Sequence, residues 1–545
     1  MKKFISACLA IVLIVSNSFA QSISDKKQAL LYSVFQLELN TLNDGYNPYY
    51  QTDLEVTFTR PDESKVTADG FYDGGLEFKA RAYCDQIGTW QWQSNSNDPD
   101  LDGHSGNFEV VPSDLLGKLR ISTKDPYQFA YDNGDWFLHI GDTGYRFLIP
   151  SEPLWREYID QAAEMGATKI RAWFAMKRGT VEDLFTANQP DIALHFWREM
   201  EKRILYTLDN HPQINIQLIP FAEDTERIKA YARGDSSAQL ILEYAQARWS
   251  SFPNIQWTLS NDRKIITSEN LTGREIHPDM IDQMGADADR QEPWNTLITN
   301  HQSRFSGYDF VDAEWSDIIT VEDLDQVGGE VILEFRKKGK QPIVLDEDRY
   351  ERYRYPAHPR YYFRRLMWAS LLSGGHATYG GLRTYEPYNG QAYTAYGMKM
   401  EYQPNQGLES GVSGYFDANR AGILRQGGHD FRFIHQFFQD AGITLENMES
   451  NDEMAGNQPL QYKCMQGKGY VIAYLANPSG TEPGTDFPSL TIPKIDLNLA
   501  KNIYKVKWFD PDSGNWTTGS RIEGPSVSLQ APGSEDWILL LEKID

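Results

Sequence analysis

Asn254-Ile-Gln-Trp-Thr-Leu-Ser-Asn-Asp262 is a short run of β-forming residues that ends in an Asn–Asp pair. In the segment before it, apolar residues recur at helical spacing: Leu240, Ile241, Tyr244, Ala245 and Trp249. A helix, a turn, a buried strand and then polar residues is the order of one unit of a (β/α) barrel, whose chemistry lies at the carboxyl ends of the strands. We therefore expect Asp262 to be one half of a catalytic carboxylate pair.

The same alternation of strand and helix continues on both sides of this unit. Seven further strands are predicted at residues 136–143, 167–175, 214–221, 295–301, 308–315, 341–348 and 374–381. Eight strands separated by helices predict an α/β fold, a (β/α)8 TIM barrel within residues 116–452.

Period-two alternation predicts a β-sandwich on each side of the barrel. Leu54, Val56 and Phe58 alternate with polar residues in the first module, which is predicted for residues 21–115. A second sandwich is predicted for residues 453–545. Residues 382–428 are rich in Gly, Tyr, Asn and Gln, and we expect this long loop to form a lid over the barrel.

Residues 1–20 have the basic head, apolar middle and small-residue end of a secretory signal. We expect cleavage after Ala20 and export to the periplasm or the medium. The apolar part is too short to span a membrane comfortably, and no later segment is predicted to do so.

Composition narrows the class of protein. The net charge is −24, which argues against a nucleic-acid partner, because such proteins need basic surfaces. Aromatic residues make up 13% of the chain, which fits carbohydrate binding but also a large core. Cys84 and Cys464 are far apart, so we expect two buried thiols rather than a disulfide. Neither cysteine has a histidine nearby in sequence, so no metal site or thiol nucleophile is suggested. No cofactor is expected.

Acidic residues at strand ends favour glycoside hydrolysis, which needs one carboxylic acid to protonate the leaving oxygen and one carboxylate to attack or to activate water. Strands four and seven face each other across a barrel, so Asp262 and Glu347 are the favoured pair. Asn261 could donate a hydrogen bond to the sugar 2-hydroxyl. The other candidate acids are Asp142, Glu223 and Glu314.

Four stretches resemble the apiosidase-like glycoside hydrolases: FLHIGDTGY (137–145), RWSSFPNIQWTLSND (248–262), PIVLDEDRYE (342–351) and LLSGGHATYGG (371–381). Residues 30–112 are similar to the sandwich that often precedes such barrels. WFDPDSGNW (508–516) with APGSEDWILLLEK (531–543) resembles the module that follows them and is named for collagen binding.

The resemblance implies a TIM-barrel enzyme related to the retaining clan. It assigns Asp262 as the general acid/base and Glu347 as the nucleophile. Asp346 and Asp348 stand where the family often has Gly and Pro, and three adjacent acids would raise one another's pKa. Asp346 therefore stays an alternative nucleophile.

Each assignment has a structural alternative. Asp262 could cap a following helix, and Glu347 could pair with Arg349 or Arg352. Asp142 could bind a sugar hydroxyl or stabilise its own turn. The remaining candidates for substrate binding are equally consistent with interior packing: Trp173, His301, Trp315, His376 and Tyr379.

Residues 349–365 contain six arginines in an otherwise acidic chain. Arg352 or Arg354 could bind a carboxylate or sulfate on the substrate. The alternative is that these arginines balance neighbouring acids or lie on a solvated helix face.

The sequence thus predicts an exported glycoside hydrolase that cleaves plant or algal polysaccharide, or its oligosaccharides, with retention of configuration. One rival is a non-catalytic carbohydrate-binding protein on a degenerate barrel. A second rival is a polysaccharide lyase, which would need a Tyr or His base with a charge-neutralising Arg.

Overall fold

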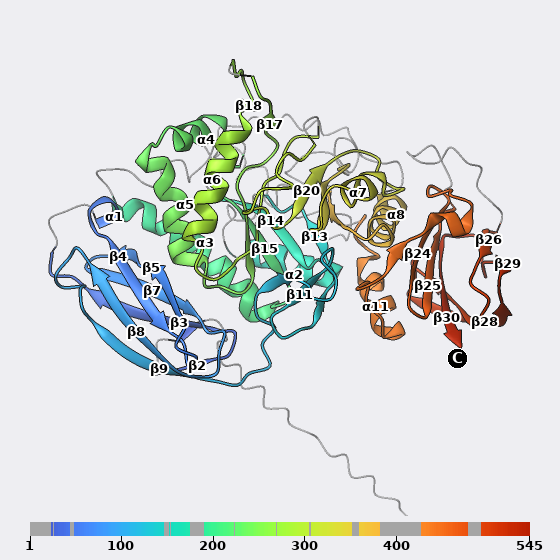
Figure 1. Ribbon diagram of the computed structural model, residues 1–545, viewed down its shortest axis with the longest axis horizontal. Coiled ribbons are helices and arrows are strands. Elements are labelled where there is room, and N and C mark those ends of the chain that lie inside the picture. Colours follow the sequence, from blue (N-terminus) through green and yellow to red (C-terminus); the bar gives the residue numbers. More distant parts are fainter. Residues whose placement is uncertain are drawn as a thin grey trace, which may run out of the picture.

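The computed structural model describes residues 23–24, 27–43, 48–145, 152, 154–174, 190–222, 224–268, 270–304, 307–350, 359–381, 427–477 and 492–544. An N-terminal β-sandwich, a central barrel and a C-terminal β-structure follow one another along the long axis (Figure 1).

Eight parallel strands form the central barrel. In chain order they are β13 (Ile140–Asp142), β14 (Lys169–Trp173), β15 (Asn215–Ile219), β16 (Ile255–Thr258), β19 (Ile298–Thr299), β20 (Ile319–Glu322), β21 (Ile343–Glu347) and β22 (His376–Tyr379). Their order in the sheet is β19-β16-β15-β14-β13-β22-β21-β20. β22 pairs with β13, so the sheet closes except between β19 and β20, where the hydroxyls of Thr299 and Thr320 are 2.9 Å apart. The predicted TIM barrel is confirmed.

Helices cover the outside of the barrel (Figure 1). They are α2 (Leu154–Met165), α3 (Pro190–Asn210), α4 (Thr225–Ala232), α5 (Ser236–Trp249), α6 (Pro278–Gln291), α7 (Glu330–Phe335), α8 (Pro359–Leu372) and α11 (Phe431–Ala441). Local sequence sets several ends. Asp235 accepts the N–H of Ala238 and caps α5, and Gly442 ends α11 in the left-handed conformation. In the described residues, no helix combines the length and apolar character that a membrane span requires.

The predicted strand at 308–315 is wrong, and the sixth barrel strand is β20 instead. The aromatic residues of 308–315 lie in turns outside the barrel. Trp315 packs against Gly285 of α6, and its indole donates a hydrogen bond of 2.7 Å to Asp282. The error arose because Trp315 is buried against a helix and residues 308–315 pair with no neighbouring strand.

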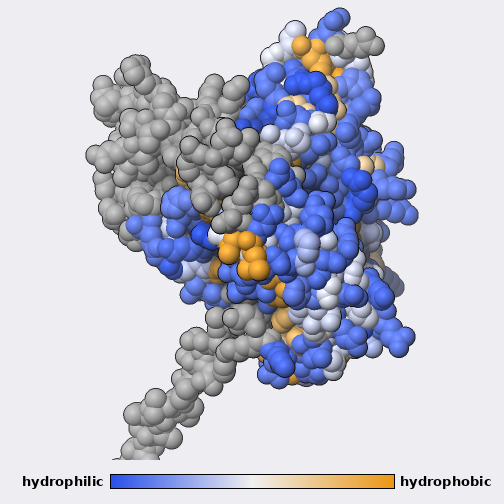
Figure 2. Space-filling view, turned by 90° about the vertical axis from the view of Figure 1, so that its left-hand side faces the viewer, coloured by the Kyte–Doolittle hydropathy of each residue, from blue (hydrophilic) through white to orange (hydrophobic). Residues whose placement is uncertain are grey.

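Two sheets form the N-terminal sandwich. One contains β1 (Ile23–Ser24), β3 (Val34–Asn40), β7 (Glu77–Tyr83) and β6 (Phe71–Gly74); the other contains β2 (Gln28–Leu30), β9 (Ser105–Val111), β8 (Gly88–Ser96), β4 (Leu54–Thr59) and β5 (Lys65–Asp69). Cys84, the residue after β7, and Cys464 in β24 (Tyr462–Gly467) are buried free thiols, as predicted. The visible face on this side of the molecule is mostly hydrophilic, with small scattered apolar patches (Figure 2).

Six strands form the main C-terminal sheet: β23 (Glu449–Ser450), β24 (Tyr462–Gly467), β25 (Tyr470–Leu475), β30 (Trp537–Ile544), β27 (Ile503–Asp510) and β28 (Asn515–Glu523). β26 (Lys494–Asn498) and β29 (Ser526–Gln530) form a separate pair. A small sheet, β10 (Leu119–Ile121), β11 (Phe129–Tyr131) and β12 (Trp136–Phe137), shares a core with Leu297, Ile318 and Val344, and so closes the amino end of the barrel.

Buried ion pairs join the N-terminal sandwich to the barrel. Arg81 of β7 binds both carboxylate oxygens of Glu201 on α3, at 2.9 Å each. Arg248 of α5 bridges the two parts, because it binds Glu201 and also Asp73 of β6, both at 2.7 Å. Burial alone would raise the pKa of Glu201, but Arg248 and Arg81 lower it to about 2.

Replacing Arg248 by Met is expected to lower the free energy of unfolding by about 3–5 kcal/mol, because two buried carboxylates lose their common cation. Urea denaturation measures this change. Arg198→Met is the matched control, since the half-exposed Arg198 contacts the same Asp73 carboxylate at 3.2 Å and should contribute about 1 kcal/mol or less. Equal losses in both variants would contradict the assignment.

The arginine-rich segment joins the barrel to the C-terminal sheet. Arg364 of α8 binds Asp430 at 2.5 Å and the two oxygens of Asp536, and Arg360 binds Asp430 and Asp512. Arg349 pairs with Asp325. For these residues, the prediction that arginines balance neighbouring acids is confirmed. Arg352 and Arg354 lie outside the described residues.

Candidate active site

A β-bulge directs Glu347 into the mouth of the barrel. Val321 pairs with Leu345, but Glu322 pairs with Glu347, so Asp346 is the extra residue between the two pairs. Strand side chains alternate between the two faces of a sheet, and Asp346 already points into the interior. The bulge allows Glu347 to turn to the same side, as bulges beside active sites often do.

Asp346, Glu347 and Asp348 therefore have different surroundings. Asp346 is fully buried and binds Lys169 and the hydroxyl of Thr378, each at 2.5 Å. Arg171 and Lys169 lower its pKa although burial opposes them. Asp348 accepts a hydrogen bond from Tyr362 at 2.7 Å, and burial raises its pKa to about 6. Asp346 is thus an interior ion-pair partner, which removes the reason to consider it as the nucleophile.

Arg171 of β14 connects the two candidate strand ends. Its guanidinium is fully buried and donates a hydrogen bond of 2.7 Å to Asn261 Oδ1. It also donates to the carbonyl of Asp346 and lies 3.7 Å from Glu347 Oε2. One cation thereby fixes the end of β16 relative to the end of β21.

Burial raises the pKa of Glu347, and the negative charge of Asp262 adds to this rise, whereas Arg171 opposes it. The Tyr145 hydroxyl donates a hydrogen bond of 2.7 Å to Glu347 Oε2, which also opposes the rise. Tyr145 stacks on Trp173 of β14, with ring centroids 4.6 Å apart. The Glu347 carboxylate thus lies between Tyr145 and Arg171, close enough to Asp262 for the charge of Asp262 to raise its pKa.

Asp262 lies four residues beyond the last residue of β16 and has a left-handed conformation, with φ +48°. No helix begins there, because β17 (Lys264–Ile265) follows and pairs with β18 (Glu275–Ile276); the helix-cap alternative is therefore wrong. Ala222, after β15, has a similar φ of +45°, and its carbonyl accepts the N–H of Asn261 at 2.8 Å. Such conformations often concentrate at functional sites.

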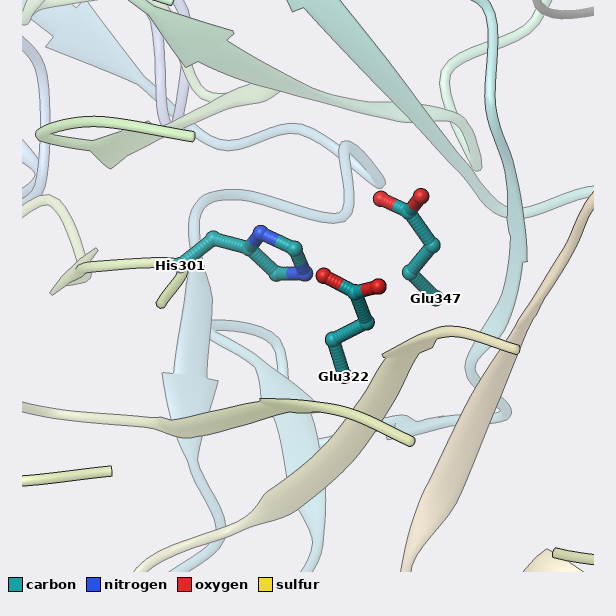
Figure 3. Close-up of side chains that lie close together, drawn as sticks. All are labelled: His301, Glu322 and Glu347. Carbon is teal, nitrogen blue, oxygen red and sulfur yellow. The ribbon is translucent and has the colours of Figure 1, made fainter. Parts of the chain in front are cut away.

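His301 and Glu322 lie beside this pair. His301 follows β19, is fully buried, and accepts the Asp262 N–H on Nδ1 at 3.3 Å. Suitable ligand atoms of His301, Glu322 and Glu347 all lie within 4.8 Å of one another, and the three side chains converge (Figure 3). Sequence reasoning missed Glu322, because the sixth strand was placed at 308–315.

The sequence model of the family described as "Apiosidase-like, catalytic domain" matches residues 123–441, which is more than half of the chain. The chain belongs to this apiosidase-like family. A model of a domain of unknown function, DUF5060, matches residues 29–97. A search of curated proteins finds no matching relative.

Two solved structures from Bacteroides vulgatus share this fold. One carries a provisional glycoside hydrolase name; it is 18% identical, covers 95% of this chain and 100% of its own, and has a TM-score of 0.68. The other is a glycoside hydrolase of family 5; it is 13% identical, covers 78% of this chain and 94% of its own, and has a TM-score of 0.59. The barrel of this apiosidase-like chain is therefore a glycoside hydrolase fold.

Other predicted residues of the apiosidase-like barrel lie at its mouth. Asp142 ends β13, is fully buried and accepts a hydrogen bond of 3.0 Å from Tyr158. A Cβ at Gly144 would collide with that hydroxyl, so Gly144 allows the contact. Trp173 and Tyr379 end β14 and β22 and are buried, Trp173 against Tyr145. These positions suit the floor of a subsite.

Two predicted substrate residues lie elsewhere. His376 begins β22 rather than ending it; its ring packs against His139 at the amino end of the barrel, and it bonds the Tyr127 carbonyl at 3.1 Å. Trp315 packs on α6 and donates a hydrogen bond to Asp282 of that helix. Glu314, beside it, is exposed outside the barrel. Glu223, Arg352 and residues 382–426 of the expected lid lie outside the described residues.

The cluster of His301, Glu322 and Glu347 offers three metal ligands by residue type. Its surroundings favour a cluster whose charges are balanced by arginines rather than by a metal ion. Arg304 lies 3.4 Å from Glu322 and Arg171 lies 3.7 Å from Glu347, so two cations already face the carboxylates. Burial lowers the pKa of His301 well below its usual value, and because Nδ1 accepts a hydrogen bond, Nε2 carries the ring proton. In this tautomer Nε2 would have to lose its proton before it could bind a metal.

Because arginines already balance these carboxylates, dialysis against EDTA is expected to leave the activity unchanged, and added Mn²⁺ or Zn²⁺ should not increase it. Activity before and after chelation, with metal content measured by mass spectrometry, checks this. Loss on chelation and recovery with one metal would instead identify the cluster as a metal centre.

Tyr145→Phe is expected to move the acidic limb of kcat/KM against pH upward by about half to one pH unit, because a hydrogen bond to the Glu347 carboxylate is lost. A carboxylate nucleophile attacks only when ionised, so a higher pKa of Glu347 would remove activity at a higher pH. Tyr308→Phe is the control, since its buried hydroxyl bonds Ser316 and Thr299 away from Glu347. An unchanged acidic limb in Tyr145→Phe would show that the Tyr145 hydrogen bond does not control the ionisation on which activity depends.

Proposed function

We propose that the protein is a retaining glycoside hydrolase in which Glu347 is the nucleophile and Asp262 is the acid/base. The observation that supports this most is the convergence of the two strand ends on Arg171, with Glu347 held by Tyr145 and close enough to sense the charge of Asp262.

The chemistry follows from these positions. In the first step a Glu347 oxygen attacks the anomeric carbon, and Asp262 gives its proton to the departing glycosidic oxygen. A covalent glycosyl ester forms on Glu347. In the second step Asp262 takes a proton from water, the water oxygen attacks the anomeric carbon, and the Glu347 carboxylate is released.

Asn261 has a defined orientation for substrate binding. Its Oδ1 accepts the Arg171 hydrogen bond, so its amide N–H groups point away from Arg171 and are available as donors. This supports a hydrogen bond from Asn261 to the sugar 2-hydroxyl, an interaction that strengthens in the transition state.

Glu322 is the second candidate for the acid/base. A Glu322 carboxylate oxygen lies within 4.8 Å of one on Glu347, but Glu322 comes from the adjacent strand, is almost fully buried and is paired with Arg304. Asp262 is more accessible to a substrate, with 23% of its side chain exposed. Asp262 is therefore preferred.

We further propose that the enzyme is exported and acts on plant or algal polysaccharide or its oligosaccharides. The support for export is the signal-like sequence of residues 1–20. The support for a saccharide substrate is the family and the aromatic floor formed by Tyr145 and Trp173. A non-catalytic binding protein is the main rival.

Hydrolysis of plant and marine polysaccharides by wild type, Asp262→Asn, Glu347→Gln and Glu322→Gln tests the proposal. Wild type should release sugar. Asp262→Asn should lose about 10²–10⁴-fold in kcat/KM, and Glu347→Gln at least as much. Proton NMR during the first turnovers should show the product anomer with retained configuration.

Each alternative predicts a different result. If Glu322→Gln loses more activity than Asp262→Asn, Glu322 is the acid/base. Binding of a saccharide by all four proteins without cleavage would favour the binding-protein alternative. An unsaturated product that absorbs in the ultraviolet would favour a lyase.

A further inference from the structure

Arg274 forms an ion pair with the proposed acid/base. Its Nη2 lies 2.8 Å from Asp262 Oδ2. Arg274 directly precedes β18, and its carbonyl accepts the N–H of Lys264 at 3.3 Å, so the pairing of β17 with β18 brings it back to Asp262. These two short strands project from the barrel beside α4 and α6 (Figure 1).

This ion pair opposes the first chemical step. Asp262 must carry a proton when the leaving group departs, and a guanidinium at 2.8 Å favours the ionised carboxylate. The pair is accessible, because 59% of the Arg274 side chain is exposed. An exposed ion pair contributes little stability and can exchange its partner at low cost.

Among the described residues, the other charged side chains near Asp262 have contacts elsewhere. Arg171 is fully buried against Asp346 and Glu347, and Arg304, 24% exposed, lies beside Glu322. His301 is buried and contacts the Asp262 backbone. Arg274 is thus the most exposed of these three arginines.

Building on the proposed function, we propose that Arg274 binds an anionic group of the substrate, a uronate carboxylate or a sulfate ester, and so releases Asp262 to take up the proton that it must donate. The anionic group replaces Asp262 at the guanidinium, and Asp262 is protonated from solvent. Because the acid/base contacts the glycosidic oxygen, the anionic group belongs to the sugar on the leaving-group side.

The exchange distinguishes charged from neutral substrates. An anionic substrate replaces one ion pair by another, and a guanidinium can bind a carboxylate or a sulfate with two hydrogen bonds. A neutral substrate brings no anionic group to take the place of Asp262 at the guanidinium. Arg274 is therefore a specificity-determining residue that acts through Asp262.

Matched substrates test this specificity: a uronate-containing oligosaccharide and its carboxyl-reduced form, and a sulfated oligosaccharide and its desulfated form. Wild type is expected to show a kcat/KM at least about tenfold higher for one anionic form than for its neutral partner. Arg274→Gln should lose this preference, mainly through a higher KM for the anionic form. Arg290→Gln, at an exposed arginine of α6 paired with Asp287, should retain it.

The two pairs also distinguish the source of the anion, because a preference confined to one pair identifies a carboxylate or a sulfate. Equal cleavage of both members of each pair by wild type would overturn the inference. So would a preference that Arg274→Gln retains unchanged.

A second experiment needs no turnover. Carbon-13 NMR of the full chain with labelled aspartate, assigned by comparison with Asp262→Asn, follows the Asp262 carboxyl group. Arg274→Gln should raise the pKa of Asp262 by about half to one unit. In wild type, sodium sulfate should raise it relative to sodium chloride at equal ionic strength, and Arg274→Gln should not respond.

An Asp262 pKa that is the same in wild type and Arg274→Gln would overturn the inference. If no saccharide is cleaved but the pKa rises as expected, the proposed function fails while the ion pair is confirmed as the control on Asp262. The two failures are thereby distinguishable.

Discussion

The guanidinium of Arg171 on β14 lies in the barrel with no exposed surface and contacts the carboxyl ends of two other strands, β16 and β21. An unpaired buried cation would cost several kcal/mol, so folding requires Asn261 and Asp346 to meet it together. That requirement places Asp262 and Glu347, the neighbours of these residues in sequence, at the same mouth. The candidate active site is thus a consequence of satisfying one buried charge.

The barrel interior is polar where most such barrels contain branched apolar layers. Lys169 crosses it to reach Asp346, which also accepts the Thr378 hydroxyl. Gly141 makes room for this arrangement, because a Cβ there would collide with Thr378. Beneath this layer the small sheet β10–β12 supplies an apolar base. The charged layer fixes the mouth, and the apolar layer stabilises the fold.

The three acids at the mouth each face a different arginine. Glu347 faces Arg171, Glu322 faces Arg304, and Asp262 faces Arg274. The exposed side-chain fraction of these arginines rises from 0% through 24% to 59%, so their partners become progressively easier to exchange. A buried pair suits a nucleophile that stays ionised, whereas an exposed pair suits an acid/base that must change its protonation state.

Sequence alone determined the barrel, its first five strands and its last two, because helical periodicity and short buried strands are local signals. It also predicted Asp262 and Glu347 as a pair of acids at strand ends, and the structure places both residues at the mouth of the barrel. The sequence did not determine the sixth strand, since the aromatic residues of 308–315 are buried without forming a strand, Trp315 among them against α6. It therefore missed Glu322 and placed Trp315 wrongly. Only the tertiary structure decided which acid meets which arginine: the bulge that turns Glu347 inward and the approach of Arg274 to Asp262 depend on contacts between distant segments, which no local pattern encodes.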